Sequence, residues 1–311
     1  MTGGAGFIGS HLVDSLVLNQ FDVTVFDNLS AGNLDNLKEN TNVANYHFIE
    51  GDLKNSENIG NALQQIELVY HLAANPEVRE VDPGAHFREN QVATFNLLEG
   101  MREAGTRNIV FASTSTIYGE ASTQPTPENY GPLLPISTYG ASKLACEAMI
   151  ASYACTYGLR GLILRLGNVV GARSNHGVIS DFLKKLRQNP KSLEVLGDGT
   201  QSKSYIHISD CISATEFIIR NFLKSDTRVD AYNVSSADRV SVRRIAEIVL
   251  EEVGAKGQIK TTGGVDGGRG WMGDVKLMQL STQKLQALGW KEQYNSEMAI
   301  KQAARELIRQ I

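Results

Sequence analysis

The sequence has few of the features that would place it outside the ordinary globular proteins. Its 311 residues include three cysteines, Cys146, Cys155 and Cys211, and no C-x-x-C pair. A disulfide framework and a zinc cluster are therefore not expected, and a reducing cytoplasm is the simplest compartment. The sequence contains no apolar run of about 18 residues and no signal peptide, so we expect neither a membrane span nor export.

The sequence also has no large excess of positive or of negative charge. The 30 lysines and arginines nearly balance the 34 aspartates and glutamates, which leaves a net charge of −4. This balance gives no general reason to expect binding to nucleic acid or to an anionic membrane. The 6 histidines show no metal-ligand spacing such as H-E-x-x-H, so we expect no metal site.

A further absence lies at the start of the sequence. Gly3, Gly6 and Gly9 form a G-x-x-G-x-x-G run in "MTGGAGFIGSH", typical of a loop that cradles a pyrophosphate between a buried strand and a helix. The helix has its residues, at 7–18, but only two residues precede the glycines. We therefore expect the first strand of the sheet to be truncated in this sequence. One hypothesis is that translation starts upstream of the assigned methionine.

Short apolar runs alternate with longer segments over the first half of the chain. Runs rich in Val, Ile and Leu, each followed by a segment long enough for a helix, predict right-handed βαβ units and a parallel sheet. We expect strands at 22–27, 46–52, 67–73, 108–114 and 159–166, and helices at 7–18, 86–104 and 137–157.

Beyond the last of these strands, glycine-rich and polar loops become frequent, and the longest covers 261–274. Loops of this length inside a compact domain are usually functional or disordered. The expected fold class is therefore α/β: a doubly wound, Rossmann-type parallel sheet with a smaller, loop-rich α/β substrate domain. We expect the first domain to cover 1–166, with 204–228 returning to it, and the second to cover 167–203 and 229–311.

An acidic residue supports the interpretation of the glycines. Asp27 ends the strand "DVTVFD", 18 positions after Gly9. A carboxylate there would accept hydrogen bonds from both ribose hydroxyls of a dinucleotide and would repel a 2′-phosphate. The sequence therefore favours NAD over NADP.

A second group of residues indicates catalysis. Tyr139 and Lys143 are four positions apart at the start of a predicted helix, and hence on one face of it. The strand "NIVFAST" ends in hydroxyl side chains that include Thr114, at the sheet edge where α/β proteins bind ligands. A phenol close to an ammonium group and an oxidised nicotinamide would have a lowered pKa and could take a proton from a substrate hydroxyl.

Five stretches together resemble the extended short-chain dehydrogenases/reductases, specifically the UDP-glucose (UDP-galactose) 4-epimerases: "TGGAGFIGSH", "FDNLSAGN", "YHLAANPEV", "FASTSTIYGE" and "YGASKLACE". The likeness extends over nearly the whole chain, because "GDGTQSKSYIHISD" and "RGWMGD" also match the positions where this family handles the UDP-sugar. The resemblance implies NAD-dependent 4-epimerisation of a UDP-hexose through a transient 4-keto sugar. It also implies a homodimer in which the helices at 86–104 and 137–157 pair with those of a second subunit.

The resemblance assigns roles by position. It implies that Tyr139 is the catalytic base, with Lys143 and Thr114 as its partners. The residues implied to hold NAD are Gly3, Gly6, Phe7, Ile8, Gly9, Asp27, Asn28, Ser30, Asp52, Leu53, Leu72, Ala73, Ala74, Asn90, Tyr139, Lys143 and Val169. Those implied to hold the UDP-sugar are Thr114, Asn168, Lys203, Arg269, Asp274 and Met278.

Two departures affect the expected diphosphate grip. Lys203 stands where many relatives have arginine, which replaces a two-pronged clamp by a point charge. Arg269 and Asp274 are spaced more widely than in the bacterial pattern.

Related reactions compete with epimerisation. Sugar-nucleotide 4,6-dehydratases need an acidic pair directly after the catalytic threonine. Decarboxylases of UDP-glucuronate carry glutamate at the second of these two positions. This chain has Ser115 and Thr116 there, so both reactions are disfavoured.

A keto-reductase needs nothing beyond Tyr139, Lys143 and Thr114. A 4-epimerase of UDP-N-acetylhexosamine or UDP-glucuronate is a further alternative, because a flexible methionine at 278 closes the sugar pocket less firmly than tyrosine would. A non-catalytic NAD sensor or scaffold on the same fold is disfavoured by the intact catalytic set.

Overall fold

The computed structural model describes residues 1–55, 58–79, 82 and 84–310. It divides into two compact units, each assembled from three segments of the chain. Unit 1 contains Met1–Ile117, Thr138–Arg165 and Thr215–Tyr232, and unit 2 contains Tyr118–Ser137, Leu166–Ala214 and Asn233–Ile311.

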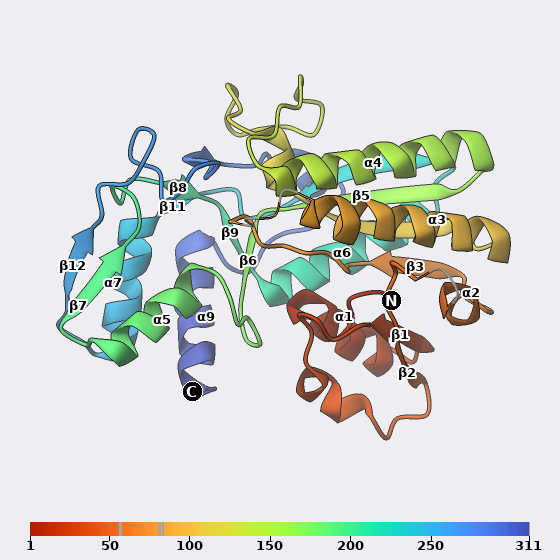
Figure 1. The fold of residues 1–311 in the computed structure, drawn as a ribbon, viewed down its shortest axis with the longest axis horizontal. Helices are drawn as coiled ribbons and strands as arrows, with labels where there is room; N and C mark the ends of the chain where they lie inside the picture. Colours follow the sequence, from red (N-terminus) through yellow and green to blue (C-terminus); the bar gives the residue numbers. More distant parts are fainter. Residues whose placement is uncertain (56–57, 80–81, 83, 311) are drawn as a thin grey trace. The chain divides into compact units, whose positions relative to one another are not determined.

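Unit 1 is built around the predicted parallel sheet (Figure 1). Its elements in chain order are α1 (Phe7–Leu18), β1 (Val23–Asp27), η1 (Leu34–Asn40), β2 (Tyr46–Glu50), α2 (Ile59–Ala62), β3 (Leu68–His71), η3 (Phe87–Val92), α3 (Ala93–Ala104), β4 (Asn108–Thr114), η4 (Ser115–Tyr118), α4 (Thr138–Tyr157) and β5 (Arg160–Leu166). The end of α6 (Ile208–Leu223) and most of β10 (Val229–Val234) return to it.

The sheet has the Rossmann order. Strands β1 and β2 pair in parallel, and a four-stranded part has the order β10-β5-β4-β3. Thr2 joins the two parts, since it forms parallel bridges to Phe26 and to His71. The first strand is therefore as short as expected, and Thr2 occupies its place in the order.

Apolar side chains between the sheet and its helices form the core of unit 1. Phe111, Leu97 and Ile150 come from β4, α3 and α4 and are almost completely buried in one cluster. Full burial of such a side chain contributes about 1.5–3 kcal/mol each. Figure 1 shows α3 and α4 lying side by side, and the two helices are in contact.

Unit 2 has short strands and a separate helical core. Its elements are β6 (Asn168–Val170), α5 (Val178–Gln188), β7 (Ser192–Val195), β8 (Ser202–Lys203), β9 (Tyr205–His207), the start of α6, β11 (Val240–Ser241), α7 (Val242–Val253), β12 (Gln258–Thr261), β13 (Leu277–Met278), α8 (Gln283–Ala287) and α9 (Ser296–Arg309). Helices α5, α7 and α9 pack on one another, and α5 and α7 also pack on the β7–β12 ladder (Figure 1). Their shared cluster includes Phe182, Val249 and Ile300.

All five predicted strands and the three predicted helices are confirmed, with small differences at their ends. The helix predicted at 86–104 is not α-helical throughout, because Phe87–Val92 is a π-helix. Among the described residues, no helix combines the length and apolar character needed to cross a bilayer.

The division into units differs from the expected domain boundaries in two places. Residues 118–137 belong to unit 2, and the segment returning to unit 1 is 215–232, in place of the expected 204–228. The physical reason for the first difference is backbone pairing. Thr126 N donates to Gln279 O (2.8 Å), and Ser281 N donates to Thr126 O (2.9 Å), which ties the loop to unit 2.

Candidate functional site

The glycine run forms a close-packed turn at the start of α1. Gly3 has φ +69°, and a Cβ there would lie 2.5 Å from Ala73 N. A Cβ at Gly9 would lie 2.2 Å from Gly3 O. Gly6 precedes the helix with an extended backbone, and within the described chain no side chain caps it. The first N–H groups of α1 are therefore free of a side-chain cap, as a phosphate-binding helix start requires.

Asp27 holds this turn in place. Its carboxylate is buried and accepts hydrogen bonds from Ala5 N (2.9 Å) and Leu29 N (2.9 Å). Next to it, Asn28 Nδ2 donates to Asp52 Oδ2 (3.1 Å), and Ser30 Oγ donates to Asn28 Oδ1 (2.7 Å). Four polar residues predicted to hold NAD, Asp27, Asn28, Ser30 and Asp52, therefore lie together where β1 and β2 end.

The pKa of Asp52 lies below its usual value. Burial acts to raise it, but hydrogen bonds from Lys54 N and Asn28, together with the Lys54 charge, outweigh this effect. Leu53, which follows it, is buried.

The end of β3 lies against the glycine turn. Leu72 N donates to Thr2 O (3.1 Å), and Ala73 and Ala74 follow, both partly exposed. Asn90 is buried and donates from Nδ2 to Ser142 Oγ (2.9 Å). Ser142 Oγ in turn donates to Tyr139 O (2.8 Å), so Asn90 is linked to the helix turn that carries the predicted base.

The three predicted catalytic residues lie at the end of β4 and in the first turns of α4. The hydroxyls of Tyr139 and Thr114 are hydrogen-bonded. Lys143 is buried one helical turn further on, and its Nζ lies 4.1 Å from the centre of the Phe111 ring. Cation–π contact with this ring compensates part of the hydration that the ammonium group loses.

Burial has the largest effect on the pKa values of Tyr139 and Lys143. Burial raises the pKa of Tyr139 to about 12, and the hydrogen bond with Thr114 opposes this only in part. Burial lowers the pKa of Lys143 to about 8, against the raising effect of the Cys146 thiol and the Glu147 carboxylate. Desolvation dominates the pKa of this phenol in the protein alone, whereas the predicted lowering includes the positive charge of an oxidised nicotinamide beside it.

Sequence reasoning missed two groups beside these residues. The His86 ring is buried 5.8 Å from the Tyr139 ring and contacts Thr138 Oγ1 (3.0 Å). Glu147 forms a buried ion pair with Arg165. The spacing held a signal for Glu147, since it follows Lys143 by four positions and so shares the helix face of the catalytic pair.

Unit 2 contains the residues predicted to bind the sugar-nucleotide, except Thr114, which lies in unit 1. Asn168 and Val169 begin β6, and Asn168 Nδ2 donates to Ser204 O (3.1 Å). Met278 is buried in β13 and pairs in register with Lys203 of β8. The predicted sugar gate and one predicted phosphate ligand are therefore neighbours.

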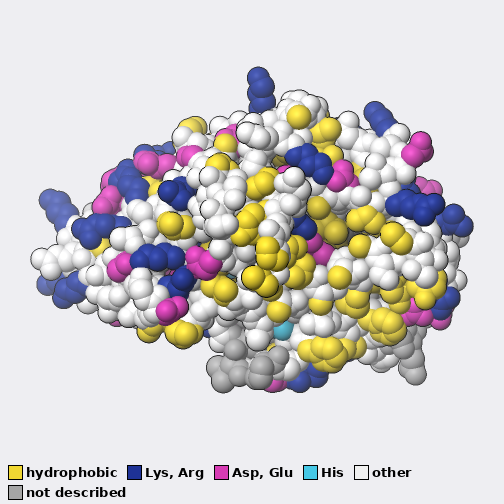
Figure 2. Space-filling model, turned by 90° about the horizontal axis from the view of Figure 1, so that it is seen from above, with side chains coloured by type: hydrophobic (Ala, Val, Ile, Leu, Met, Phe, Trp, Pro, Cys, Tyr) yellow, Lys and Arg dark blue, Asp and Glu magenta, His cyan; other side chains and the backbone are white. Residues whose placement is uncertain are grey.

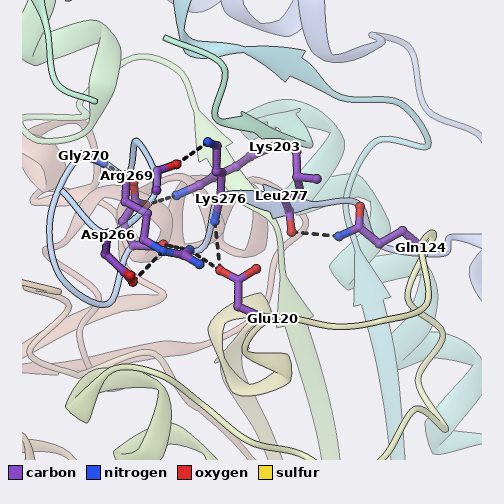
Figure 3. Close-up of polar contacts among 10 residues, drawn as sticks. Glu120, Gln124, Lys203, Asp266, Arg269, Gly270, Lys276 and Leu277 are labelled. Atoms are coloured by element: carbon purple, nitrogen blue, oxygen red, sulfur yellow. Dashed lines mark hydrogen bonds and ion pairs between the residues drawn. The ribbon is translucent and has the colours of Figure 1, made fainter. Parts of the chain in front are cut away.

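Both predicted phosphate-binding cations are ion-paired in the structure (Figure 3). Lys203 Nζ lies 2.6 Å from the buried carboxylate of Asp274. Arg269 pairs with Glu120 and, through Nε, with Asp266 at 3.1 Å. Asp274, predicted to contact the nucleotide, also accepts a hydrogen bond from Gly270 N (3.1 Å) and so anchors the loop.

In the part of the chain that the structure describes, no group of three or more His, Cys, Asp and Glu side chains is placed to hold a metal ion. The residues brought together are instead a phosphate-binding helix start, acidic groups at strand ends and a hydrogen-bonded tyrosine–threonine pair with a nearby lysine. These features define a dinucleotide-dependent oxidoreductive site on a Rossmann-type fold.

Comparison with known proteins narrows this class. A model of the NAD dependent epimerase/dehydratase family matches residues 1–235, and the chain belongs to this family. The chain is 34% identical over 308 residues to a putative UDP-glucose 4-epimerase of Methanocaldococcus jannaschii, covering 97% of this chain and 95% of that protein.

Two solved structures are also similar over the full chain. A crystal structure of a UDP-galactose 4-epimerase has a TM-score of 0.90 and 44% identity, covering 100% of this chain and 98% of that one. The UDP-N-acetylglucosamine 4-epimerase of Methanobrevibacter ruminantium, solved with UDP-N-acetylmuramic acid, has a TM-score of 0.86 and 29% identity, covering 100% and 97%.

The cofactor is NAD, and the residues present fit it. The turn at Gly3 and Gly9 leaves no room for a Cβ, and the uncapped start of α1 offers N–H groups to a pyrophosphate. Asp27 at the end of β1 provides the carboxylate that suits an unphosphorylated ribose.

Proposed function

We propose that the protein interconverts UDP-galactose and UDP-glucose by 4-epimerisation through a transient 4-keto sugar. The observation that carries the proposal is the Tyr139–Thr114 hydrogen bond, with Lys143 buried one helical turn away. Tyr139 is the proposed base that deprotonates the substrate hydroxyl, Thr114 can form a hydrogen bond with the oxygen of that hydroxyl, and Lys143 supplies a positive charge.

Tyr139, Thr114 and Lys143 each have a separate role at the sugar 4-hydroxyl. Tyr139 takes its proton as the carbon–hydrogen bond at C4 breaks and returns the proton when hydride comes back to the other face of C4. Thr114 donates a hydrogen bond to the same oxygen. Lys143 stabilises the phenolate by its charge. Bound NAD supplies the hydride acceptor and donor.

The hydroxyl cluster after β4 favours epimerisation over elimination or decarboxylation. Thr116 Oγ1 lies 3.2 Å from Thr114 Oγ1, and Thr116 N donates to the same oxygen at 3.2 Å. A dehydratase would need a carboxyl group here to move a second proton, and Ser115 and Thr116 provide none.

Unit 2 supplies the proposed grip on the nucleotide. We assign Asn168 to the sugar-nucleotide, and Lys203 and Arg269 to the diphosphate. A diphosphate is negatively charged, as are the carboxylates that now pair with these cations, so it would compete with Glu120 for Arg269 and with Asp274 for Lys203. Asp274 stays beside Lys203 as a predicted contact of the UDP-sugar.

A second candidate substrate is a UDP-N-acetylhexosamine. The observation in its favour is Met278, which is buried beside Lys203 and has a flexible side chain that can move away from a larger sugar.

We also propose that the protein is a homodimer, joined through α3 and α4. Phe95 on α3 is exposed, and so are Ala141, Ala148 and Ser152 on α4. Figure 2 shows many hydrophobic side chains on the face seen from above in Figure 1. Small residues along α4 would let a second copy of the helix approach closely, as in a four-helix bundle.

The proposed reaction is tested with purified protein and a panel of UDP-hexoses, with retained NAD measured in the same preparation. Conversion of UDP-galactose to UDP-glucose without net NADH supports the proposal. Net oxidation of NADH with a keto substrate would indicate a reductase. Absence of turnover with every UDP-sugar, in protein that retains NAD, would favour a sensor.

A further inference from the structure

Unit 1 buries a charged pair to which the proposed reaction assigns no role. Arg165 Nη2 lies 2.8 Å from Glu147 Oε2, and Arg165 Nε lies 3.2 Å from Oε1. Ser113 Oγ donates to Glu147 Oε1 at 2.5 Å. Glu147 and Arg165 are only 5% and 7% exposed, so the pair is almost completely removed from water.

Stability alone does not explain such a pair. Removing two charges from water is costly, and apolar residues of similar volume often replace a buried ion pair without loss of stability. A buried pair of this kind is better explained by what it holds in place.

The pair joins the elements that carry the proposed catalytic residues. Ser113 directly precedes Thr114 on β4, and Arg165 lies on β5. Glu147 lies on α4, four positions after Lys143 and eight after Tyr139. One carboxylate therefore links the helix that carries the base to the strand that carries the hydroxyl.

Glu147 is also the charged partner of Lys143. Two other titratable groups interact with Lys143: Cys146 on the same helix and His71 on β3. Both are neutral at neutral pH. Burial raises the pKa of the Cys146 thiol, although the Lys143 charge lowers it in part. Burial, followed by the Lys143 charge, lowers the pKa of His71 to about 3. Among the described groups that raise the pKa of Lys143, Glu147 is thus the one that carries a negative charge.

We propose that Glu147, held by Ser113 and Arg165, is a positioning residue that fixes α4 against β4 and keeps Lys143 charged beside Tyr139. This inference rests on the proposed function of these residues. Glu147 touches neither the sugar nor the cofactor in this mechanism and acts through Lys143 and the orientation of α4.

The test uses two variants of the full NAD-loaded protein. Glu147→Gln keeps the shape and removes the charge, and the double variant E147M/R165M replaces the pair by apolar side chains. We expect kcat to fall about 10-fold to 100-fold in both, with KM for the UDP-sugar changed less than about twofold. If Glu147→Gln fails to fold, the double variant can still be measured, because E147M/R165M leaves no buried charge unpaired.

The pH profile separates positioning from a merely structural role. Loss of the Glu147 charge lowers the pKa of Lys143, so the ammonium loses its proton at lower pH. We expect the alkaline limb of the kcat profile to move down by about one pH unit. The control Glu99→Gln, which breaks the ion pair with Arg102 on α3, leaves the profile unchanged.

A folded double variant with the wild-type kcat would overturn the positioning of α4, and a folded Glu147→Gln variant with the wild-type pH profile would overturn the effect of Glu147 on Lys143. The titration of Lys143 by NMR of its labelled ε-carbon, assigned through its loss in K143M, needs no turnover. If the wild type turns over no UDP-sugar, the proposed function fails. The titration then still decides whether Glu147 controls Lys143, and an unshifted Lys143 in both variants would refute that.

Discussion

The surroundings of the Tyr139 hydroxyl decide when it can act as a base. Burial raises its pKa to about 12, so the phenol holds its proton at neutral pH. Positive charge close to the oxygen reverses this preference. The proposed mechanism assigns this role to Lys143, one helical turn away, together with the charge of the oxidised nicotinamide, and the Lys143 pKa of about 8 leaves most of it charged at pH 7. Proton transfer should therefore depend on both residues.

Removal of the Tyr139 hydroxyl tests this directly. We expect Tyr139→Phe to lower kcat by about 10²–10⁴-fold, the usual effect of losing a general base, with little change in retained NAD or in melting temperature. Tyr153→Phe is the matched control, since Tyr153 lies on the same helix and its hydroxyl contacts Glu99 (2.7 Å). A Y139F enzyme with more than a tenth of wild-type kcat would contradict the assignment of the base.

These catalytic residues could be predicted because their signals are local. Tyr139 and Lys143 show their spacing on one helix, and Thr114 ends a strand that the apolar pattern reveals. The partners of Lys203 and Arg269 could not be predicted in the same way. Asp274 and Glu120 lie 71 and 149 positions away, and their contacts depend on how distant loops fold together.

The loop between β12 and β13 contains Arg269, and Figure 3 shows its ion pair with Glu120. Glu120 accepts hydrogen bonds from Arg269 and from Lys276 N (3.2 Å). If Arg269 binds the diphosphate as we propose, the diphosphate has to displace Glu120. Glu120→Gln weakens this competitor without removing the cation. Because a partly exposed ion pair contributes about 0.2–1 kcal/mol, KM for the UDP-sugar should fall by up to about fivefold, with kcat unchanged.

The control for this variant is Glu194→Gln, which removes a carboxylate from an exposed pair with Lys185 on the same unit. A rise in KM for E120Q alone would mean that Glu120 orients Arg269 for the substrate, and the competition would be refuted.

A carboxylate on α9 contacts β9, and its pKa predicts that the stability of the fold depends on pH. Glu306 accepts hydrogen bonds from His207 (3.2 Å), Gln302 (2.8 Å) and Ala172 N (2.9 Å). Burial acts to raise its pKa, but these bonds outweigh it and lower the pKa to about 2. A carboxylate with a depressed pKa stabilises the folded state above its unfolded pKa of about 4.3, and this stabilisation disappears as the pH falls toward 2.

We therefore expect Glu306→Gln to destabilise the fold by about 1–3 kcal/mol at pH 7. Its melting temperature should approach that of the wild type as the pH falls from about 4.5 to 2. Thermal melts across this range measure the effect, with the exposed Glu103→Gln on α3 as control. A difference between E306Q and wild type that is constant with pH would contradict the assigned pKa.

The apolar runs and helix-length segments predicted in the first half of the chain are confirmed, and one helical turn among them was not predicted. The buried helices at 7–18 and 137–157 appear almost residue for residue as α1 and α4. The π-helical turn Phe87–Val92 could not be predicted, because its wider turn buries Asn90 against Asn75 and Ser142, which are tertiary contacts. The spacing of apolar residues along the sequence does not reveal such a tertiary contact.

The chain as a whole passes several times between its two units. Each unit contains three separate segments, and residues 118–137 join unit 2 through contacts with residues about 150 positions later. Linear boundaries based on composition cannot detect such pairing. For the same reason, neither unit corresponds to a continuous piece of chain that could be removed by truncation.

The proposed homodimer would add a second level of assembly, and one exposed alanine tests it. Ala148 lies on the outer face of α4, and Ala148→Glu would place a carboxylate from each copy in an apolar interface. Burial of these charges without partners opposes association. We expect the wild type to sediment as a dimer at micromolar concentration and A148E as a folded monomer. Ala287→Glu on α8 is the control and should remain dimeric. A wild type that sediments only as a monomer, or an A148E variant that stays dimeric, would show that α4 does not form the interface.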